Sequence, residues 1–74
     1  MTVDAQTWIT GFSEILGLTP PNEAEIEKLL AMAGVAAHAS ERVSAPVSCW
    51  LAARAGKTAE EALAAAETLA SSLR

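Results

Sequence analysis

Several residue types that carry chemistry in small proteins are scarce in this chain of 74 residues. It has one cysteine, Cys49, and one histidine, His38. A single cysteine excludes an intramolecular disulfide, and the two residues together cannot form a zinc cluster of the usual Cys/His spacing. We therefore predict no metal site and no bound cofactor. Such cysteine usage fits a reducing cytosol.

Long hydrophobic runs and an excess of basic residues are also missing. No stretch approaches the roughly 18 apolar residues of a membrane span, and residues 1–5 lack the basic and apolar regions of a signal peptide. Five basic residues face nine acidic ones, for a net charge of −4, which argues against general nucleic-acid binding. We expect a soluble cytoplasmic protein with no membrane span and no nucleic-acid partner.

What the chain does have is alanine, which supplies much of its 51% hydrophobic content. Alanine gains little from burial, so closely packed helices with a thin core are expected. A length of 74 residues predicts a single helical domain over residues 1–74. A domain of this size buries only about 60 to 65% of the surface of its unfolded chain, so a partner chain or self-association would help it.

Cap and stop signals separate two helices in the first half of the chain. The first is predicted to begin near Thr2 or Asp4, both good N-caps, and to end at Gly17. Asn22 begins the second with a capping-box pattern after a linker that contains two prolines. The apolar pattern carries this second helix to about Arg42.

Two further helices are predicted in the second half. Pro46 suits the first turn of a third helix that Gly56 ends, and Thr58 with Glu61 is a capping box for a fourth. Strand alternation is absent, so the sequence predicts an all-α fold, a small four-helix bundle with short connections and mostly antiparallel neighbours. Residues expected to face inward are Trp8, Ile9, Phe12, Ile15 and Leu16; then Ile26, Leu29, Leu30, Ala33 and Ala37; then Val47, Trp50 and Leu51; then Ala59, Ala62, Leu63, Ala66, Ala70 and Leu73.

The predicted junction between the second and third helices is the best candidate for a site. Gly34, His38 and Arg42 would form one row on a helix. An arginine fork, the hydroxyl of Ser44 and the free backbone amides that follow Pro46 could bind an oxyanion. Residues 38–57 are also locally basic, with three cations against Glu41. An anionic ligand would exploit that charge, although the same cations could instead satisfy carboxylates on neighbouring helices.

The same junction residues also have a structural interpretation. Arg42 and Ser44 could cap backbone groups, His38 could tie the two helices together, and Gly34 could permit close approach of a neighbouring backbone. His38 has no evident nucleophile or second catalytic carboxylate nearby apart from Glu41. We therefore predict no catalytic residue and no enzyme activity.

Cys49 and the aromatic residues have alternative roles as well. Cys49 would be reactive in the first turn of the third helix, or otherwise a small buried hydrophobe. Trp8, Phe12 and Trp50 are most simply core residues. Because the core is thin, any of them is also a candidate anchor for a partner.

The residues Ala37-His38, Arg42, Ala45-Pro46 and Gly56 carry a resemblance. Over roughly residues 8–70 the chain resembles a small actinobacterial domain family of unknown function. Members of that family occur alone or attached to molybdenum cofactor guanylyltransferases, and others lie near formate dehydrogenase and its accessory proteins. The resemblance implies a pathway and a class of protein partner, but no catalytic mechanism.

Two functions follow as hypotheses. The first is a noncatalytic accessory protein or subunit that docks on a molybdoenzyme such as formate dehydrogenase or on its cofactor maturation machinery, with a homo-oligomer as a further option. If docking is the function, an exposed apolar patch should remain in the isolated fold. The alternative is a module that binds an anion or nucleotide, such as the phosphates of a pterin dinucleotide, at His38, Arg42, Ser44 and Pro46.

Overall fold

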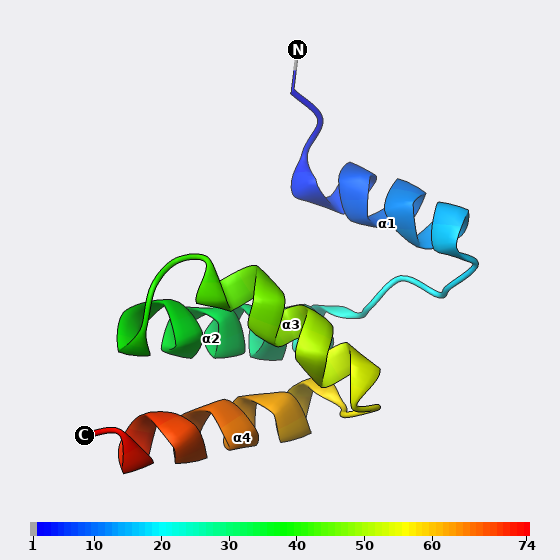
Figure 1. Ribbon diagram of the computed structural model, residues 1–74. Coiled ribbons are helices and arrows are strands. Elements are labelled where there is room, and N and C mark those ends of the chain that lie inside the picture. The colour runs from blue at the N-terminus through cyan, green and yellow to red at the C-terminus, as the bar shows by residue number, and fades with distance from the viewer. Residues whose placement is uncertain (1) are drawn as a thin grey trace.

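Four helices joined by short connections account for most of the chain in the computed structural model, which describes residues 2–74 (Figure 1). No strand occurs within that range, so the predicted all-α class with four helices is confirmed. None of these helices is both long and apolar enough to cross a bilayer. The helices are α1 (Ala5–Leu16), α2 (Glu23–Ala39), α3 (Ser44–Arg54) and α4 (Ala59–Ser72).

The end of α1 and the starts of α2 and α4 form as the sequence predicts. At the start of α2, the backbone N–H of Glu25 donates to Asn22 Oδ1 at 2.8 Å, and the Asn22 N–H donates to Glu25 Oε1 at 2.9 Å. Thr58 and Glu61 form the same reciprocal capping box for α4. Gly17 follows α1 in the left-handed conformation, at a φ of 72°, which an alanine would adopt only with strain.

The second predicted break lies earlier than expected. We predicted that the helix beginning at Asn22 continues to about Arg42, but α2 ends at Ala39 and α3 begins at Ser44. The connection is a turn in which the Ser44 and Ala45 N–H groups donate to the Glu41 and Arg42 carbonyls at 2.9 and 3.1 Å. These bonds satisfy the first backbone donors of α3 without a side-chain cap.

Helix α2 is the centre of the packed part of the molecule. Both α3 and α4 pack on it, while α3 and α4 touch each other only sparsely. In Figure 1, α2 and α4 run in the same direction and α3 runs against both. The prediction of mostly antiparallel neighbours is therefore wrong for the most extensive contact, α2 with α4. The intervening α3 returns the chain to the end of the molecule at which α2 starts.

The core of these three helices is very small. Met32, which the predicted inward face of α2 omitted, is 1% exposed and is the one large side chain among residues 2–74 with less than 2% exposure. Ala62 is the other buried hydrophobic residue, at 5%. Met32 lies one turn from Leu29 and Ala36 on the α2 surface, so helical spacing alone could have found it. Several residues predicted to face inward are instead more than half exposed, namely Leu30, Val47, Trp50, Leu51 and Leu73.

Helix α1 stands apart from the other three. It packs against none of them and projects from the start of α2 on the connection formed by residues 17–22 (Figure 1). The radius of gyration is 13.1 Å, against about 11 Å for a compact chain of this length. The accessible surface is 5881 Å², whereas a typical monomer of 7.7 kDa exposes about 4,300 Å². The chain thus exposes on the order of 1,500 Å² more than a compact monomer of its mass.

Candidate functional site

The apolar face of α1 is the largest departure from a normal protein surface. Trp8 is 63% exposed and Ile15 82% exposed, and Phe12 and Leu16 are more than half exposed. The Trp8 and Phe12 rings stack with their centroids 6.2 Å apart and their planes 19° apart. We predicted that these residues are buried in the bundle, which is wrong, because α1 has no helix to pack on. The prediction that an exposed apolar patch remains is confirmed.

Local interactions hold α1 in shape without that packing. The Asp4 carboxylate accepts a hydrogen bond from the Thr7 N–H at 2.7 Å, and this bond lowers the pKa of Asp4. At the other end, the Gly17 and Leu18 N–H groups donate to the carbonyls of Glu14 and Ser13 at 3.0 and 2.9 Å. An isolated helix of 12 residues is marginal in water, so these caps favour the helical form of the apolar face.

A groove between α3 and α4 is the second exposed apolar feature. It has a volume of about 530 Å³, and α2 forms its floor with Met32, Val35, Ala36 and Ala39. The sparse contact between α3 and α4 leaves it open. No pattern in the sequence indicates this groove, because the groove depends on how far the two helices diverge. The wall residues are mostly small: Ser44, Ser48, Leu51, Ala52 and Ala55 from α3, and Ala62, Ala65, Ala66, Leu69, Ala70 and Leu73 from α4.

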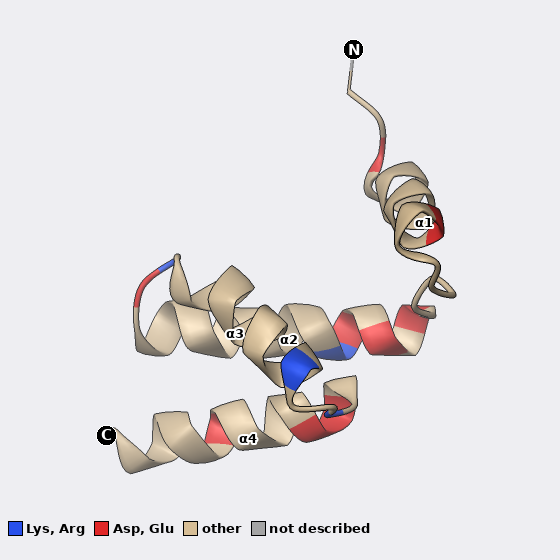
Figure 2. Cartoon of the chain, turned by 45° about the vertical axis from the view of Figure 1, so that its right-hand side comes forward, with Lys and Arg blue, Asp and Glu red and all other residues tan. Residues whose placement is uncertain are grey.

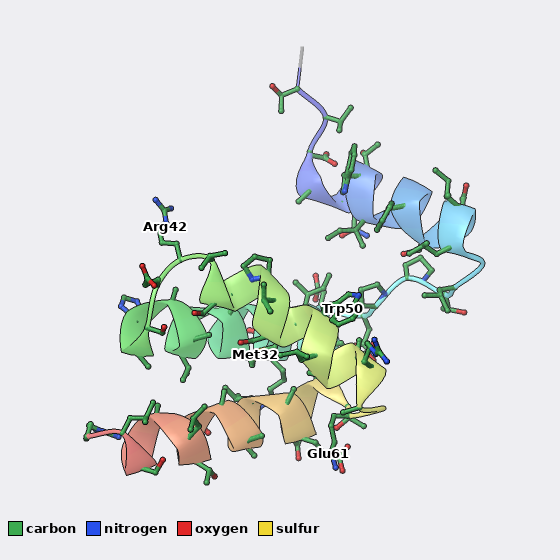
Figure 3. All side chains as sticks on the ribbon, viewed as in Figure 1. Met32, Arg42, Trp50 and Glu61 are labelled. Atoms are coloured by element: carbon green, nitrogen blue, oxygen red, sulfur yellow. The ribbon has the colours of Figure 1, made fainter. Side chains whose placement is uncertain are left out.

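The junction residues do not come together as a row. His38 lies in the last turn of α2 and Pro46 in the first turn of α3, but Arg42 lies between the helices, so the predicted continuous helical row through Arg42 is wrong. Figure 3 shows the Arg42 side chain pointing away from the helices. The Ser44 hydroxyl donates to the Ser40 hydroxyl at 3.1 Å rather than to a backbone group.

The structural roles expected of the junction side chains are likewise not observed. His38 and Arg42 are exposed, and within residues 2–74 their side chains form no hydrogen bond that ties α2 to α3. A methyl group added at Gly34 would meet nothing within 4 Å, so the expected close approach of a neighbouring backbone at this residue is wrong.

The junction also lacks the free amides on which an anion site would depend. The N–H groups of Ser44 and Ala45 already donate to carbonyls in the turn, and Pro46 has none. The residues that follow Pro46 lie inside α3. The cations of residues 38–57 do not gather there. Arg42 lies before α3, whereas Arg54 and Lys57 lie at its far end, about 15 Å along the helix (Figure 2). The basic residues that are close together in the sequence therefore lie at opposite ends of α3.

The acidic first turns of α2 and α4 lie at one of those ends. Because α2 and α4 run in the same direction, their acidic first turns lie at the same end of the molecule (Figure 2). Hydrogen bonding to the backbone N–H of Thr58 lowers the pKa of Glu61, and the nearby Lys57 adds a smaller effect in the same direction. Within residues 2–74, no group of three or more histidine, cysteine or acidic residues is arranged to hold a metal ion.

Trp50 and Cys49 occupy α3 without forming a site. The Arg54 guanidinium lies 4.9 Å from the centre of the Trp50 ring, so Arg54 pairs with an aromatic face. Trp50 is exposed, and its predicted role as a partner anchor stays a prediction. Cys49 is a half-buried free thiol.

Sequence comparison places the whole described chain within one family model. A model described as "Domain of unknown function (DUF6457)" matches residues 2–74. This confirms the resemblance to a small family of unknown function and extends it beyond residues 8–70. No curated protein and no solved structure matches the chain.

Proposed function

The chain belongs to the DUF6457 family, and we propose that it is a noncatalytic accessory protein that docks on a partner protein through the apolar face of α1. The partner class comes from the resemblance: a molybdoenzyme such as formate dehydrogenase, or a protein of its cofactor maturation machinery. The observation that carries the proposal is the exposed face of Trp8, Phe12, Ile15 and Leu16 on a helix that packs against no other helix.

The composition of this face suits a docking surface. Tryptophan and other aromatic residues dominate binding energy at protein interfaces, and truncation of a central anchor typically costs about 2 to 4 kcal/mol. Exposed contiguous apolar patches of more than a few hundred Å² are rare on monomers and mark interaction sites. Gly11 lies beside the stacked rings of Trp8 and Phe12, so the face has a shallow hollow that a partner side chain can enter.

The alternative, an anion or nucleotide site at His38, Arg42, Ser44 and Pro46, has less support. It needs free amides at the start of α3 and a local cluster of cations. The turn uses the amides of Ser44 and Ala45, and Arg54 and Lys57 lie at the opposite end of α3 from Arg42. Arg42 alone would have to hold the phosphate, with one polar partner in Ser44.

The proposal is tested by measuring affinity for purified candidate partners. We expect immobilised chain to bind purified formate dehydrogenase or a molybdenum cofactor guanylyltransferase from the same source. Trp8→Ala should weaken that binding about 30-fold or more, which corresponds to about 2 kcal/mol. Leu30→Ala is the matched control, because Leu30 is equally exposed on α2 but lies outside the α1 face.

Circular dichroism of the same variants separates docking from folding. Because α1 packs on no other helix of its own chain, Trp8→Ala should keep the helical circular dichroism of α2, α3 and α4. Equal binding by Trp8→Ala and Leu30→Ala would refute docking through α1. A pterin dinucleotide that raises the thermal midpoint of the parent but not of Arg42→Ala would favour the anion site instead.

A further inference from the structure

We propose that the groove between α3 and α4 receives α1 from a second copy of this chain, and that two copies exchange their α1 helices reciprocally. The inference goes beyond the proposed function, although both use the apolar face of α1. It assigns an occupant to the groove, which the proposed function does not use. It also makes the chain a dimer in which the apolar face of α1 is covered until α1 leaves the groove of the other copy.

The shapes of the two surfaces are complementary. The groove walls consist mainly of alanine and serine, whereas α1 presents the bulky side chains of Trp8, Phe12 and Ile15. Large side chains that enter a surface of small ones allow two helices to approach closely. The α1 helix of 12 residues is about 18 Å long, and the α4 wall from Ala62 to Leu73 is about 17 Å long.

The exposed leucines of the groove indicate an incomplete interface. Leu51 from α3, and Leu69 and Leu73 from α4, line the groove, yet each is more than half exposed. An inserted α1 would cover these leucines and its own aromatic side chains in one step. Two reciprocal insertions would do so on both copies, which is the arrangement of a closed symmetric dimer.

The charges of the two surfaces are also complementary. Lys57 is the only charged residue in the groove lining. The α1 segment from Val3 to Gly17 carries Asp4 and Glu14 and no basic residue. Insertion of α1 therefore brings acidic side chains to a groove whose single charged lining residue is positive.

The exposed area matches what a dimer requires. A standard interface covers about 800 Å² on each partner. The surface that this chain exposes beyond that of a compact monomer, on the order of 1,500 Å², is larger than one such share. Reciprocal exchange of α1 can therefore form a standard interface while other surface stays accessible.

The connection before α2 favours a second copy over the groove of the same chain. Pro20 and Pro21 fix their own φ angles, and each restricts the residue before it to extended conformations. In Figure 1 this segment leads α1 away from α2, α3 and α4. To bring α1 into the groove of its own chain, residues 17–22 would have to change conformation, which two consecutive prolines oppose. Stiff hinges of this kind favour exchange of an element between copies.

The mass of the full chain in solution tests the exchange. Light scattering after size exclusion, over a wide range of loading concentrations, should give twice the chain mass of 7.7 kDa for the parent. Phe12→Asp on α1 and Ala65→Arg in the groove should each give the single-chain mass. Leu30→Asp, on an exposed site outside both surfaces, should stay dimeric. Ala65 is exposed on α4, so Ala65→Arg should keep its helical circular dichroism; Leu69→Asp serves as a second groove variant.

Mixing the two single-chain variants identifies the contact. Phe12→Asp retains an intact groove and Ala65→Arg an intact α1, so the mixture should form a dimer that neither forms alone. A parent of single-chain mass at every concentration would overturn the exchange. A dimer lost with Phe12→Asp but retained in both groove variants would also overturn it, since α1 would then pair with α1.

The same variants separate this inference from the proposed function. Ala65→Arg frees α1 without changing its face, so it should bind a purified partner protein at least as tightly as the parent does. Loss of the dimer without any partner binding would refute the proposed function and support the exchange. Partner binding by a parent that is always a single chain would support the proposed function and refute the exchange.

Discussion

Replacement of Met32 by alanine should remove the largest single contribution to the packing of α2, α3 and α4. Met32 is 1% exposed at the point where α2 faces the other two helices, as labelled in Figure 3. Ala62 is the only other buried hydrophobic residue in the described chain, and large side chains such as Leu29, Val35 and Leu63 are only half-buried. The whole packed unit therefore depends on one flexible thioether.

The size of the effect follows from the atoms removed. Met32→Ala deletes three side-chain heavy atoms, worth about 2.4 kcal/mol at roughly 0.8 kcal/mol each. Substitutions of this type span about 2 to 5 kcal/mol, according to how well the surroundings collapse. Met32 lies on the floor of the open groove, where neighbours can relax, so we expect about 2 to 3 kcal/mol. For a domain of this length that lowers the thermal midpoint by roughly 10 to 20 °C.

Urea unfolding followed by circular dichroism, at one fixed protein concentration, measures this loss. Met32→Leu conserves volume and should cost less than about 1.5 kcal/mol. Leu30→Ala, on an exposed position of the same helix, should cost less than about 0.5 kcal/mol. A Met32→Ala loss no larger than that of Leu30→Ala would refute the inference that Met32 holds the three helices together.

Other substitutions test the local structure. Gly34→Ala should raise the free energy of unfolding by about 0.5 to 1 kcal/mol, because the added methyl meets nothing within 4 Å; a loss would reveal a hidden contact. Asn22→Ala should lower it by about 1 kcal/mol by removing the N-cap of α2, measured in the same urea titration. Arg42→Ala should leave the thermal midpoint unchanged, since the side chain points into solvent. Folding lowers the pKa values of Asp4 and Glu61, so their contribution to stability is present at neutral pH and is lost as the pH falls through the acidic carboxyl range. The helical circular dichroism signal at 222 nm should therefore decrease as the pH is lowered, and it should decrease less in Glu61→Gln.

Local signals in the sequence predicted helix ends well, because the caps act within a few residues. Asn22, Thr58, Gly17 and Gly56 all stand where the sequence places them. The predicted end of α2 was wrong by about three residues, since no glycine marks the true end. Ser40 ends the helix there through the turn that leads into α3.

The packing of the helices on one another could not be predicted from such local signals. An amphipathic face shows that Trp8 and Phe12 have a reason to be buried, but the pattern contains nothing about which surface buries them. The candidate site at Arg42 failed to assemble for a related reason. Its residues are close in sequence, but a turn separates them, and the backbone N–H groups of Ser44 and Ala45 donate to carbonyls of that turn.

The separation of α1 from α2, α3 and α4 has a consequence for how this chain can change over evolutionary time. In most small domains, an apolar residue that recognises a partner also packs the interior, so altered recognition reduces stability. Here substitutions at Trp8 or Ile15 alter an outer face of a helix that the remaining three do not contact. Selection can therefore alter that face for different partners while Met32 and the capping residues stay unchanged, provided that the altered face still fits the groove of a second copy.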